Sequence, residues 1–329
     1  MRLAYVANPN SIHTRRWVQH FAGRGHEIHL ISDQTPRDSV PPGVHWHRLA
    51  SRLRGPGLRY LSLGHGLRQL LRELQPDLLH AHTVSPAGWL GAMAGFHPLI
   101  VTAWGSDLLV APGRSPIYHL LARWVLRQAD YVTCVSEGLV QAARALGADP
   151  GRLDLAPWGI DTEIYHSGGG TCALRAELGL GPGPVVLSMR WIRPVYNPLT
   201  IAQAIPHVLR RVPGAQFVIR TYACDADLRA QFKAIIDQED ASEAVHYVGH
   251  LPDETAIAEL YRLSDLAVSV PSSDGMPLSV LEAMACGTAL VLSDIPALRE
   301  WIQDEREGLF VPPGDVQPLG GAVLRLLED

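Results

Sequence analysis

Two carboxylates, Asp274 and Glu282, stand eight positions apart in a segment whose other residues suit an anion site. Asp274 precedes a Gly-x-Pro turn, and Glu282 lies one turn inside the apolar helix that follows. The apolar run 266–270 predicts a buried strand before the turn, and Gly287 is typical of the position after a helix ends. A loop that leaves a strand and opens a helix presents free backbone N–H groups, which favour a negatively charged ligand.

The start of this helix predicts a site for the diphosphate of a nucleotide-sugar. The backbone amides expected to face the anion are those of Gly275, Met276, Leu278 and Ser279. Asp274 and Glu282 could accept hydrogen bonds from hydroxyl groups on the two sides of the diphosphate, and the backbone of Gly275–Pro277 would orient the sugar. A diphosphate between two polyols describes a nucleoside-diphosphate sugar. The plainer alternative makes Asp274 a turn residue and Glu282 an exposed helix residue.

The segment resembles the retaining glycosyltransferases of family 4 (group 1), which carry two acids spaced as Glu-x7-Glu and a helix of the type Leu-Glu-Ala-Met-Ala-Cys-Gly. Asp274 stands at the first acidic position, one methylene shorter than glutamate, and Glu282 matches the second. The resemblance implies the GT-B fold, in which two Rossmann-like domains with parallel sheets face a central cleft. It also implies sugar transfer from a UDP- or GDP-linked donor to an acceptor hydroxyl, with retention of configuration and with no metal or other cofactor.

Arg190 follows the expected strand 185–189 and occupies the position of the family's diphosphate-binding arginine. The family carries a lysine a few residues further on, but this chain has none there, and Arg193 could supply the second positive charge. Two cations against a diphosphate would stabilise the leaving group without a metal. By the same resemblance, the leaving diphosphate would help to deprotonate the attacking hydroxyl, and Glu282 would hold the ribose. The plainer alternative pairs both arginines with surface acids.

Asp107 closes a second loop, Trp104-Gly105-Ser106-Asp107, which follows the expected strand 99–103. This loop resembles the family's His-Gly-x-Asp loop, although Trp104 replaces the histidine and removes an imidazole from that position. Asp107 is therefore the candidate on the acceptor side, either as a hydrogen-bond acceptor or as a base for the incoming hydroxyl. Helix capping by Asp107 is the plainer alternative.

Strands alternate with helices along the whole chain, which predicts two parallel sheets with helices on both faces. Strands are expected at residues 3–7, 27–32, 44–49, 77–81, 99–103, 131–135 and 153–156, and then at 185–189, 216–221, 245–248, 266–270, 289–293 and 309–311. Helices are expected at 14–23, 64–74, 118–128, 137–146, 198–211, 226–237, 254–263, 278–286 and 297–302. Glycine-rich sequence at 166–184 predicts a linker between an acceptor-binding domain, 1–165, and a nucleotide-sugar-binding domain, 185–329.

Several functional classes are disfavoured by what the sequence lacks. Lys233 is the single lysine and follows no glycine-rich loop, which argues against a Walker-type phosphate loop and against a pyridoxal Schiff base. No Gly-x-Gly-x-x-Gly follows an expected strand, so a nicotinamide or flavin enzyme is poorly supported. The four cysteines form no Cys-x-x-Cys pair, which indicates a reducing compartment and no disulfide framework.

Two histidine pairs and one acidic pair invite a metal interpretation that the sequence does not favour. His45 and His47, and likewise His80 and His82, face one side of an expected strand, but no third ligand is suggested nearby. Asp225-Ala-Asp227 imitates the Asp-x-Asp of metal-dependent sugar transferases, and its place at a helix start is better explained by capping.

Positive charge is concentrated in the first half of the chain, where residues 48–72 hold six arginines and no acid before Glu73. The functional interpretation is a patch for an anionic acceptor or a peripheral contact with a membrane, and the plainer one is a solvated helix face. The first residues predict a short strand rather than a signal peptide, so a cytoplasmic enzyme is expected, at the inner membrane face if the patch binds lipid. Nothing indicates a nucleic-acid partner.

Two other functions fit the same residues: a nucleotide-sugar epimerase on this fold, and a non-catalytic subunit that binds sugar nucleotides. The missing lysine, Trp104 and the shorter acid Asp274 keep the second one open. No recognisable motif identifies the sugar, the base, the acceptor or the oligomeric state. GT-B chains usually continue with a helix that crosses back to the first domain, so an end at Asp329 implies a fragment or a looser coupling of the domains.

Overall fold

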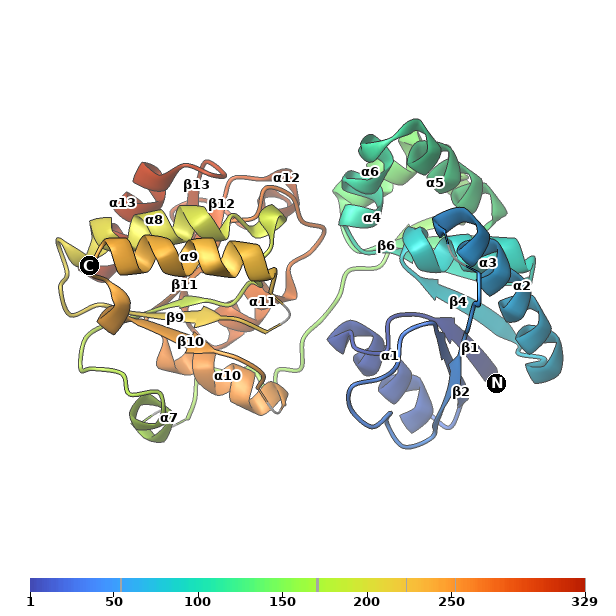
Figure 1. The fold of residues 1–329 in the computed structure, drawn as a ribbon, viewed down its shortest axis with the longest axis horizontal. Helices are drawn as coiled ribbons and strands as arrows, with labels where there is room; N and C mark the ends of the chain where they lie inside the picture. Colours follow the sequence, from blue (N-terminus) through green and yellow to red (C-terminus); the bar gives the residue numbers. More distant parts are fainter. Residues whose placement is uncertain (54, 170–171, 223, 252, 329) are drawn as a thin grey trace. The chain divides into compact units, whose positions relative to one another are not determined.

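The computed structural model describes residues 1–53, 55–169, 172–222, 224–251 and 253–328. They form two compact units, Met1–Pro157 and Trp158–Asp329, each with its own parallel sheet (Figure 1). Each unit alternates strands with helices in the manner of a Rossmann-like domain. The α/β fold class expected from the sequence is therefore confirmed.

In the described part of the first unit, seven parallel strands form a sheet in the order β3-β2-β1-β4-β5-β6-β7. The strands are β1 (Arg2–Val6), β2 (Glu27–Ser32), β3 (Val44–Arg48), β4 (Leu78–His82), β5 (Leu99–Ala103), β6 (Tyr131–Cys134) and β7 (Leu153–Leu155). The α-helices are α1 (Ile12–Gly23), α2 (Pro56–Leu74), α3 (Trp89–Ala94), α4 (Ser106–Leu109), α5 (Pro116–Gln128) and α6 (Glu137–Ala145). The strand order reverses between β1 and β4, and ligands of such sheets bind at the carboxyl ends beside this reversal.

In the described part of the second unit, six parallel strands follow the order β10-β9-β8-β11-β12-β13. The strands are β8 (Val185–Ser188), β9 (Gln216–Arg220), β10 (Val245–Val248), β11 (Leu266–Ser269), β12 (Ala289–Ser293) and β13 (Leu309–Val311). The α-helices are α7 (Cys172–Glu177), α8 (Pro198–Leu209), α9 (Ala226–Gln238), α10 (Glu254–Leu263), α11 (Leu278–Ala285), α12 (Pro296–Arg299) and α13 (Val316–Glu328). Here the order reverses between β8 and β11.

Two apolar layers cover the sheet of the second unit. One layer joins α8, α9 and α13 to strand residues such as Phe217, and the other joins α10, α11 and α12 to strand residues such as Val218. Figure 1 shows α8 and α9 on one side of the strands and α10 on the other. Because both faces are buried, these strands are almost continuously apolar in sequence.

Every expected strand is present, with ends that differ by at most one residue, but several helices differ from expectation, and α3 and α4 lie outside the expected helix ranges. α2 begins at Pro56 rather than at residue 64, and the sequence did not indicate α7 or α13. Glycines in α2 and α13 allow close packing rather than breaking the helix. A Cβ at Gly64 would lie 2.9 Å from Cβ of Met93 on α3, and one at Gly320 would lie 2.6 Å from Cδ2 of His207 on α8.

The compact units divide between Pro157 and Trp158, earlier than the domain boundary expected at residue 165. Tyr165 is 1% exposed and packs in the core of the second unit. Arg262 of α10 also binds this segment, because its Nη1 donates to the carbonyl oxygens of Ile164 and His166 at 3.2 and 3.5 Å. The segment after Trp158 therefore belongs to the second unit, and α7 lies within the expected linker 166–184.

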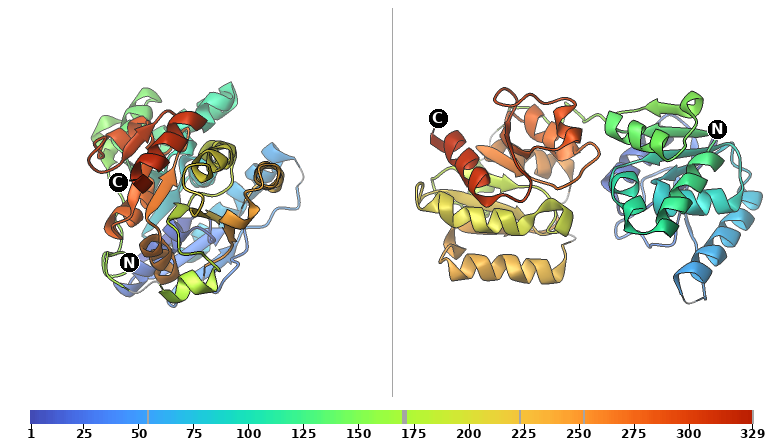
Figure 2. Two further views of the ribbon diagram at one scale, coloured as in Figure 1. Left: turned by 90° about the vertical axis from the view of Figure 1, so that its left-hand side faces the viewer. Right: turned by 90° about the horizontal axis from the view of Figure 1, so that it is seen from above.

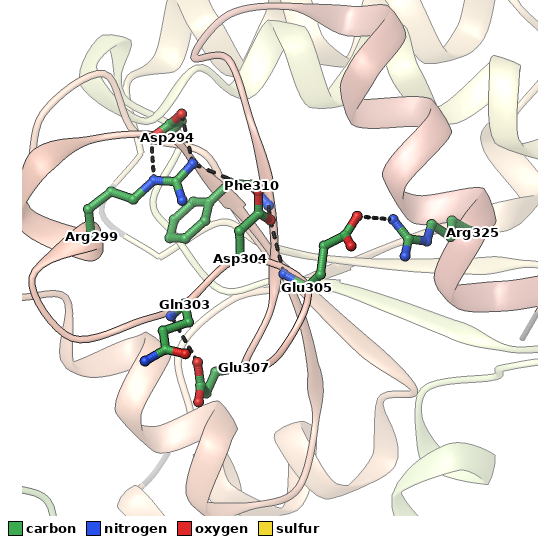
Figure 3. A network of polar contacts seen from close by, with 8 residues as sticks. All are labelled: Asp294, Arg299, Gln303, Asp304, Glu305, Glu307, Phe310 and Arg325. Atoms are coloured by element: carbon green, nitrogen blue, oxygen red, sulfur yellow. Dashed lines mark hydrogen bonds and ion pairs between the residues drawn. The ribbon is translucent and has the colours of Figure 1, made fainter.

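Two features stabilise the end of the chain within the second unit. α13 packs on α8, as Figure 2 shows, and Arg211 after α8 forms an ion pair with Glu328 at 3.1 Å. Figure 3 shows a polar network on the connection from β12 to β13, where Arg299 binds Asp294 at 2.8 Å and Arg325 of α13 binds Glu305 at 2.8 Å. None of the helices in the described ranges is long and apolar enough to cross a bilayer.

Candidate active site

Two loops at the strand-order reversal of the second unit are joined to one another. One loop follows β8 and the other follows β11, the two central neighbours in the sheet. Asn197 has a left-handed backbone (φ 48°), and its side-chain amide donates to the carbonyl oxygen of Val270 at 2.9 Å. The amide of Ser272 donates to the carbonyl oxygen of Val195 at 2.8 Å. Val195 and Asn197 lie near the position where the family carries a lysine. In this chain they hold the two loops together.

Arg190 and Asp274, one from each loop, form a half-buried ion pair. Nη2 of Arg190 lies 2.5 Å from Oδ2 of Asp274, and 14% of each side chain is exposed. Nη1 donates to Oγ of Ser279 at 3.0 Å, and the guanidinium lies 4.2 Å from the centre of the Tyr196 ring. Burial acts to lower the pKa of Arg190, but Asp274, Tyr196 and Tyr261 outweigh it and raise this pKa. The structure thus brings together three predicted site residues: Arg190, Asp274 and Ser279.

The start of α11 carries no side-chain cap. Pro277 occupies the cap position and makes no side-chain hydrogen bond to the helix amides, as expected for a site that binds its ligand there. One predicted amide is already engaged, because Gly275 donates to Oδ1 of Asp274 at 2.8 Å. Gly287 has φ 76° and ends the helix in the left-handed conformation that its sequence position predicts.

Glu282 faces inward from α11 and is 8% exposed, so the alternative of an exposed helix residue is wrong. The hydroxyl of Tyr261, on α10, donates to Oε2 of Glu282 at 3.5 Å. Burial, and then the charge of Glu282, raise the pKa of Tyr261 well above its ordinary value, which keeps the phenol protonated as a donor. Glu282 thus lies at the carboxyl edge of the sheet with a neutral donor beside it.

Arg193 and Arg220 are two further arginines of the second unit, of which only Arg193 was predicted as a site residue. Arg193 is exposed, and its guanidinium lies 4.8 Å from the centre of the Trp191 ring. Arg220 was not predicted, yet it ends β9 and is 6% exposed in the layer that holds Glu282. In the sequence, this site residue is indicated only by a basic residue that follows the three apolar residues of an expected strand.

Asp107 holds a loop of the first unit through backbone hydrogen bonds. Its Oδ2 accepts from the amide of Val84 at 2.7 Å, and its Oδ1 accepts from Gly105 at 2.8 Å and from Trp104 at 3.1 Å. Burial raises the pKa of Asp107, and the three amides oppose this increase. Asp107 therefore joins the loop after β5 to the π-helical turn η1 (Val84–Gly88). It does not cap a helix, because Gly105 is the cap residue of α4 and Asp107 lies in its first turn.

A cluster of aromatic and imidazole rings occupies the carboxyl edge of the first unit. His80 and His82 of β4 lie 4.6 Å apart by ring centres, Trp17 lies 5.4 Å from His82, and Trp104 also lies 5.4 Å from His82. Nε2 of His80 lies 2.7 Å from Oγ1 of Thr102. Burial lowers the pKa of His80 to about 3 and that of His82 well below its ordinary value, so both rings are neutral.

The metal interpretation finds no support in the part of the chain that the structure describes. There, no three His, Cys, Asp or Glu side chains converge on a position that could hold a metal ion. His29 and His47 instead share a hydrogen bond of 2.9 Å between Nδ1 and Nε2. Asp225 caps α9, because its carboxylate accepts from the amides of Asp227 and Leu228.

The sequence matches two families of known proteins, one in each half of the chain. Residues 2–136 match the family described as Glycosyl transferase 4-like, and residues 173–329 match that described as Glycosyl transferases group 1. D-inositol 3-phosphate glycosyltransferase of Nocardia farcinica is 31% identical over 281 residues, a match that covers 80% of this chain and 62% of the relative. N-acetyl-alpha-D-glucosaminyl L-malate synthase of Bacillus anthracis is 25% identical over 320 residues, covering 94% of this chain and 81% of the relative. The chain thus spans less than two thirds of the first of these relatives.

Solved structures share the fold over the whole chain. HepE of Anabaena, in complex with UDP and glucose, has a TM-score of 0.85 at 18% identity, covering 100% of this chain and 90% of that one. Sucrose-phosphate synthase of Thermosynechococcus elongatus has a TM-score of 0.83 at 19% identity, with the same coverage. The fold is GT-B, and residues 173–329 belong to the group 1 glycosyltransferases.

Proposed function

We propose that this protein transfers a sugar from a UDP- or GDP-linked donor to an acceptor hydroxyl, with retention and without a metal. The observation that carries the proposal is the half-buried Arg190, which lies beside the uncapped start of α11 at the strand-order reversal. Cations and helix amides in such a place suit a diphosphate. The Nocardia relative is named a glycosyltransferase, and the Anabaena neighbour holds UDP and glucose, which supports a nucleotide-sugar donor.

The chemistry depends on charge that develops on the leaving diphosphate. In the free protein Asp274 neutralises Arg190, so a bound diphosphate would take over this guanidinium and release the carboxylate toward the sugar. The bond between the anomeric carbon and the diphosphate oxygen breaks as the acceptor oxygen attacks from the same face. The acceptor proton passes to the departing diphosphate oxygen. Arg190 and the helix amides stabilise the negative charge left on that group.

The remaining site residues have positioning roles in this proposal. Glu282 accepts hydrogen bonds from the ribose, and Asp274 with the Gly275–Pro277 backbone orients the sugar. Arg193 supplies a second positive charge for the donor from an exposed position. Asp107 acts on the acceptor side through the loop that its carboxylate holds, because its oxygens already accept three amides.

The experiment that tests the proposal begins with a thermal-shift screen of UDP, GDP, ADP and their sugars, which selects the donor. Donor hydrolysis and transfer to an acceptor panel are then measured for the wild type, Arg190→Ala and Glu282→Ala. We expect nucleotide binding, transfer by the wild type and severe loss in both variants. Wild-type turnover in both variants would remove the proposal, an epimer formed from donor alone would favour an epimerase, and binding without turnover would favour a non-catalytic subunit.

We further propose that the first unit contacts an anionic lipid surface on the cytoplasmic side. Four large apolar side chains at the starts of α2 and α5 are more than half exposed: Leu58, Leu61, Ile117 and Leu120. The starts of these helices lie near one another, because Trp89 of α3 contacts the rings of both Tyr60 and Tyr118. Between residues 78 and 129 the single acid is the buried Asp107. Exposed apolar side chains on a basic surface favour an anionic membrane.

Vesicle sedimentation tests this contact. We expect binding to vesicles with anionic lipid at low salt, release in moderate salt, and weaker binding by the double variant Leu61→Ser, Leu120→Ser. The matched control Leu155→Ser changes an exposed leucine on β7 and should bind as the wild type does. Equal binding to neutral and anionic vesicles, or none at low salt, would contradict the proposal.

A further inference from the structure

Arg220 is a buried cation whose hydrogen-bonding capacity is largely unused. It is the last residue of β9, and only 6% of its surface is exposed. Among the described residues its Nε has no hydrogen-bond partner, and its Nη1 contacts the sulfur of Met189 at 3.9 Å. Sulfur is a weak acceptor, and burying a charge without good partners is unfavourable. A group of this kind at the ligand-binding edge of a sheet is a candidate for ligand contact.

Arg220 faces the same layer as Glu282. Neighbouring strand residues point to opposite faces, so Arg220 shares its face with Val218, which packs in the layer of α10 and α11. Glu282 lies on α11, with the hydroxyl of Tyr261 at 3.5 Å. Burial lowers the pKa of Arg220, and electrostatic interactions with Tyr261, Tyr222 and Glu282 oppose this lowering. Two opposite charges are thus buried in one layer, Arg220 at the carboxyl end of β9 and Glu282 one turn inside α11.

The two groups are complementary to a diol. A guanidinium only donates hydrogen bonds, and an ionised carboxylate only accepts them. A hydroxyl can do both, so neighbouring hydroxyls can donate to Glu282 and accept from Arg220. The diphosphate has its own cation in Arg190, whose contacts are with Asp274 and Ser279. The nucleoside is the part of the donor that remains for Arg220.

We propose that Arg220 is a donor-binding residue that donates to the ribose hydroxyls while Glu282 accepts from them. This inference rests on the proposed function, because it assigns a second ribose contact to the same donor site. Arg220 would thereby make the site selective for ribonucleotides over nucleotides that lack both hydroxyls.

The test compares nucleotide affinities by isothermal titration calorimetry on the full chain. The ligands are UDP, GDP or ADP, whichever the wild type binds most tightly, and the 2′,3′-dideoxy form of that nucleotide. The variants are Arg220→Met, which keeps the length and apolar stem, and Arg220→Lys, which keeps the charge. The matched control Arg229→Met changes an exposed arginine on α9. Circular dichroism and thermal melts show whether each variant is folded.

We expect Arg220→Met to weaken binding of the ribonucleotide by about tenfold to a hundredfold. The dideoxy nucleotide should bind the wild type and Arg220→Met equally, because the lost contact is to the absent hydroxyls. Arg220→Lys should keep part of the selectivity, and Arg229→Met should keep all of it. A role confined to folding would not change the ratio of the two affinities.

Four results would overturn the inference. Equal weakening of both nucleotides would assign Arg220 to the phosphates or to folding, and unchanged affinity would remove it from the site. If Arg220→Met fails to fold, the same ratio is read from Arg220→Lys, where wild-type selectivity with unchanged affinity counts against the inference. A wild type that binds none of UDP, GDP and ADP would instead refute the proposed function, and with it this inference.

Discussion

The carboxyl edges of the two sheets have the same topology and opposite chemistry. In the second unit, Arg190, Asp274 and Glu282 are charged groups held at one edge, with 14% or less of each exposed. In the first unit, the corresponding edge holds His80 and His82, which burial keeps neutral. The backbone arrangement alone therefore does not decide what an edge can bind.

Under the proposed function, this difference would place the donor in the second unit and the acceptor in the first. Charged side chains with unused donors suit the diphosphate and ribose of a donor, whereas neutral rings suit an uncharged partner such as the hydroxyl compound that receives the sugar. Asp107 fits this pattern, because its oxygens are occupied by amides of its own unit.

Removing Arg190 should abolish most of the activity. Arg190→Ala deletes the cation that stabilises charge on the leaving diphosphate, so we expect kcat/KM for transfer to fall about 100-fold to 1,000-fold. Steady-state assays with the selected donor measure this loss. Arg299→Ala is the matched control, because Arg299 pairs with Asp294 on the exposed connection of Figure 3. Comparable loss in both variants would remove the special role of Arg190.

Neutralising Glu282 should weaken donor binding with less effect on turnover at saturation. Glu282→Gln keeps the shape but replaces the charged acceptor, so we expect nucleotide affinity to fall by about 1.5–3 kcal/mol. Calorimetry on the full chain measures it, with melting curves to show that the buried site still folds. Unchanged affinity would mean that the inward-facing carboxylate serves only to pack against Tyr261.

Acidification should destabilise the first unit, because the carboxyl edge of its sheet holds the neutral side chains of His80 and His82. Because the folded-state pKa values of His80 and His82 lie below the unfolded value, the unfolded chain binds more protons below about pH 6.5, and stability falls as the pH decreases. Each histidine should remove about 2 kcal/mol between pH 7 and pH 5. Urea unfolding at both pH values should show a smaller decrease for His82→Phe. The control His119→Gln changes an exposed histidine on α5. If the stability of His82→Phe depends on pH as steeply as that of this control, His82 is not buried and neutral.

Asp274→Asn should separate binding from turnover. In the free protein Asp274 competes with a diphosphate for Arg190, so the neutral amide should leave the affinity for UDP or GDP equal or several-fold higher. Transfer should nevertheless slow, because the carboxylate no longer orients the sugar. Calorimetry and single-turnover assays measure the two effects. Nucleotide affinity that falls in parallel with the rate would contradict this role.

The sequence predicted the strands and the two loops that carry Arg190 and Asp274, because both follow local rules, but it did not predict the ion pair between these residues. Apolar runs define buried strands, and loops after neighbouring parallel strands meet at one edge, so Arg190 and Asp274 could be expected to lie close together. The long form of α2 was missed because Gly64 resembles a helix breaker, whereas its contact with Met93 is tertiary.

Side-chain environments were less predictable. The position of Asp107 suited both capping and an acceptor-side role, and neither predicted that its carboxylate accepts three backbone amides from two loops. Arg220 gave little signal, because an arginine at a strand end is usually exposed. The boundary expected at residue 165 followed the glycine-rich stretch after it, whereas the compact units divide after Pro157 and the buried Tyr165 packs in the core of the second unit.

A crystal structure of the full chain with the selected nucleoside diphosphate is the most direct test of the account. We predict that the diphosphate displaces Asp274 from Arg190 and lies at the start of α11, with the ribose on Glu282. A nucleotide bound elsewhere, with Arg190 and Asp274 still paired, would contradict it.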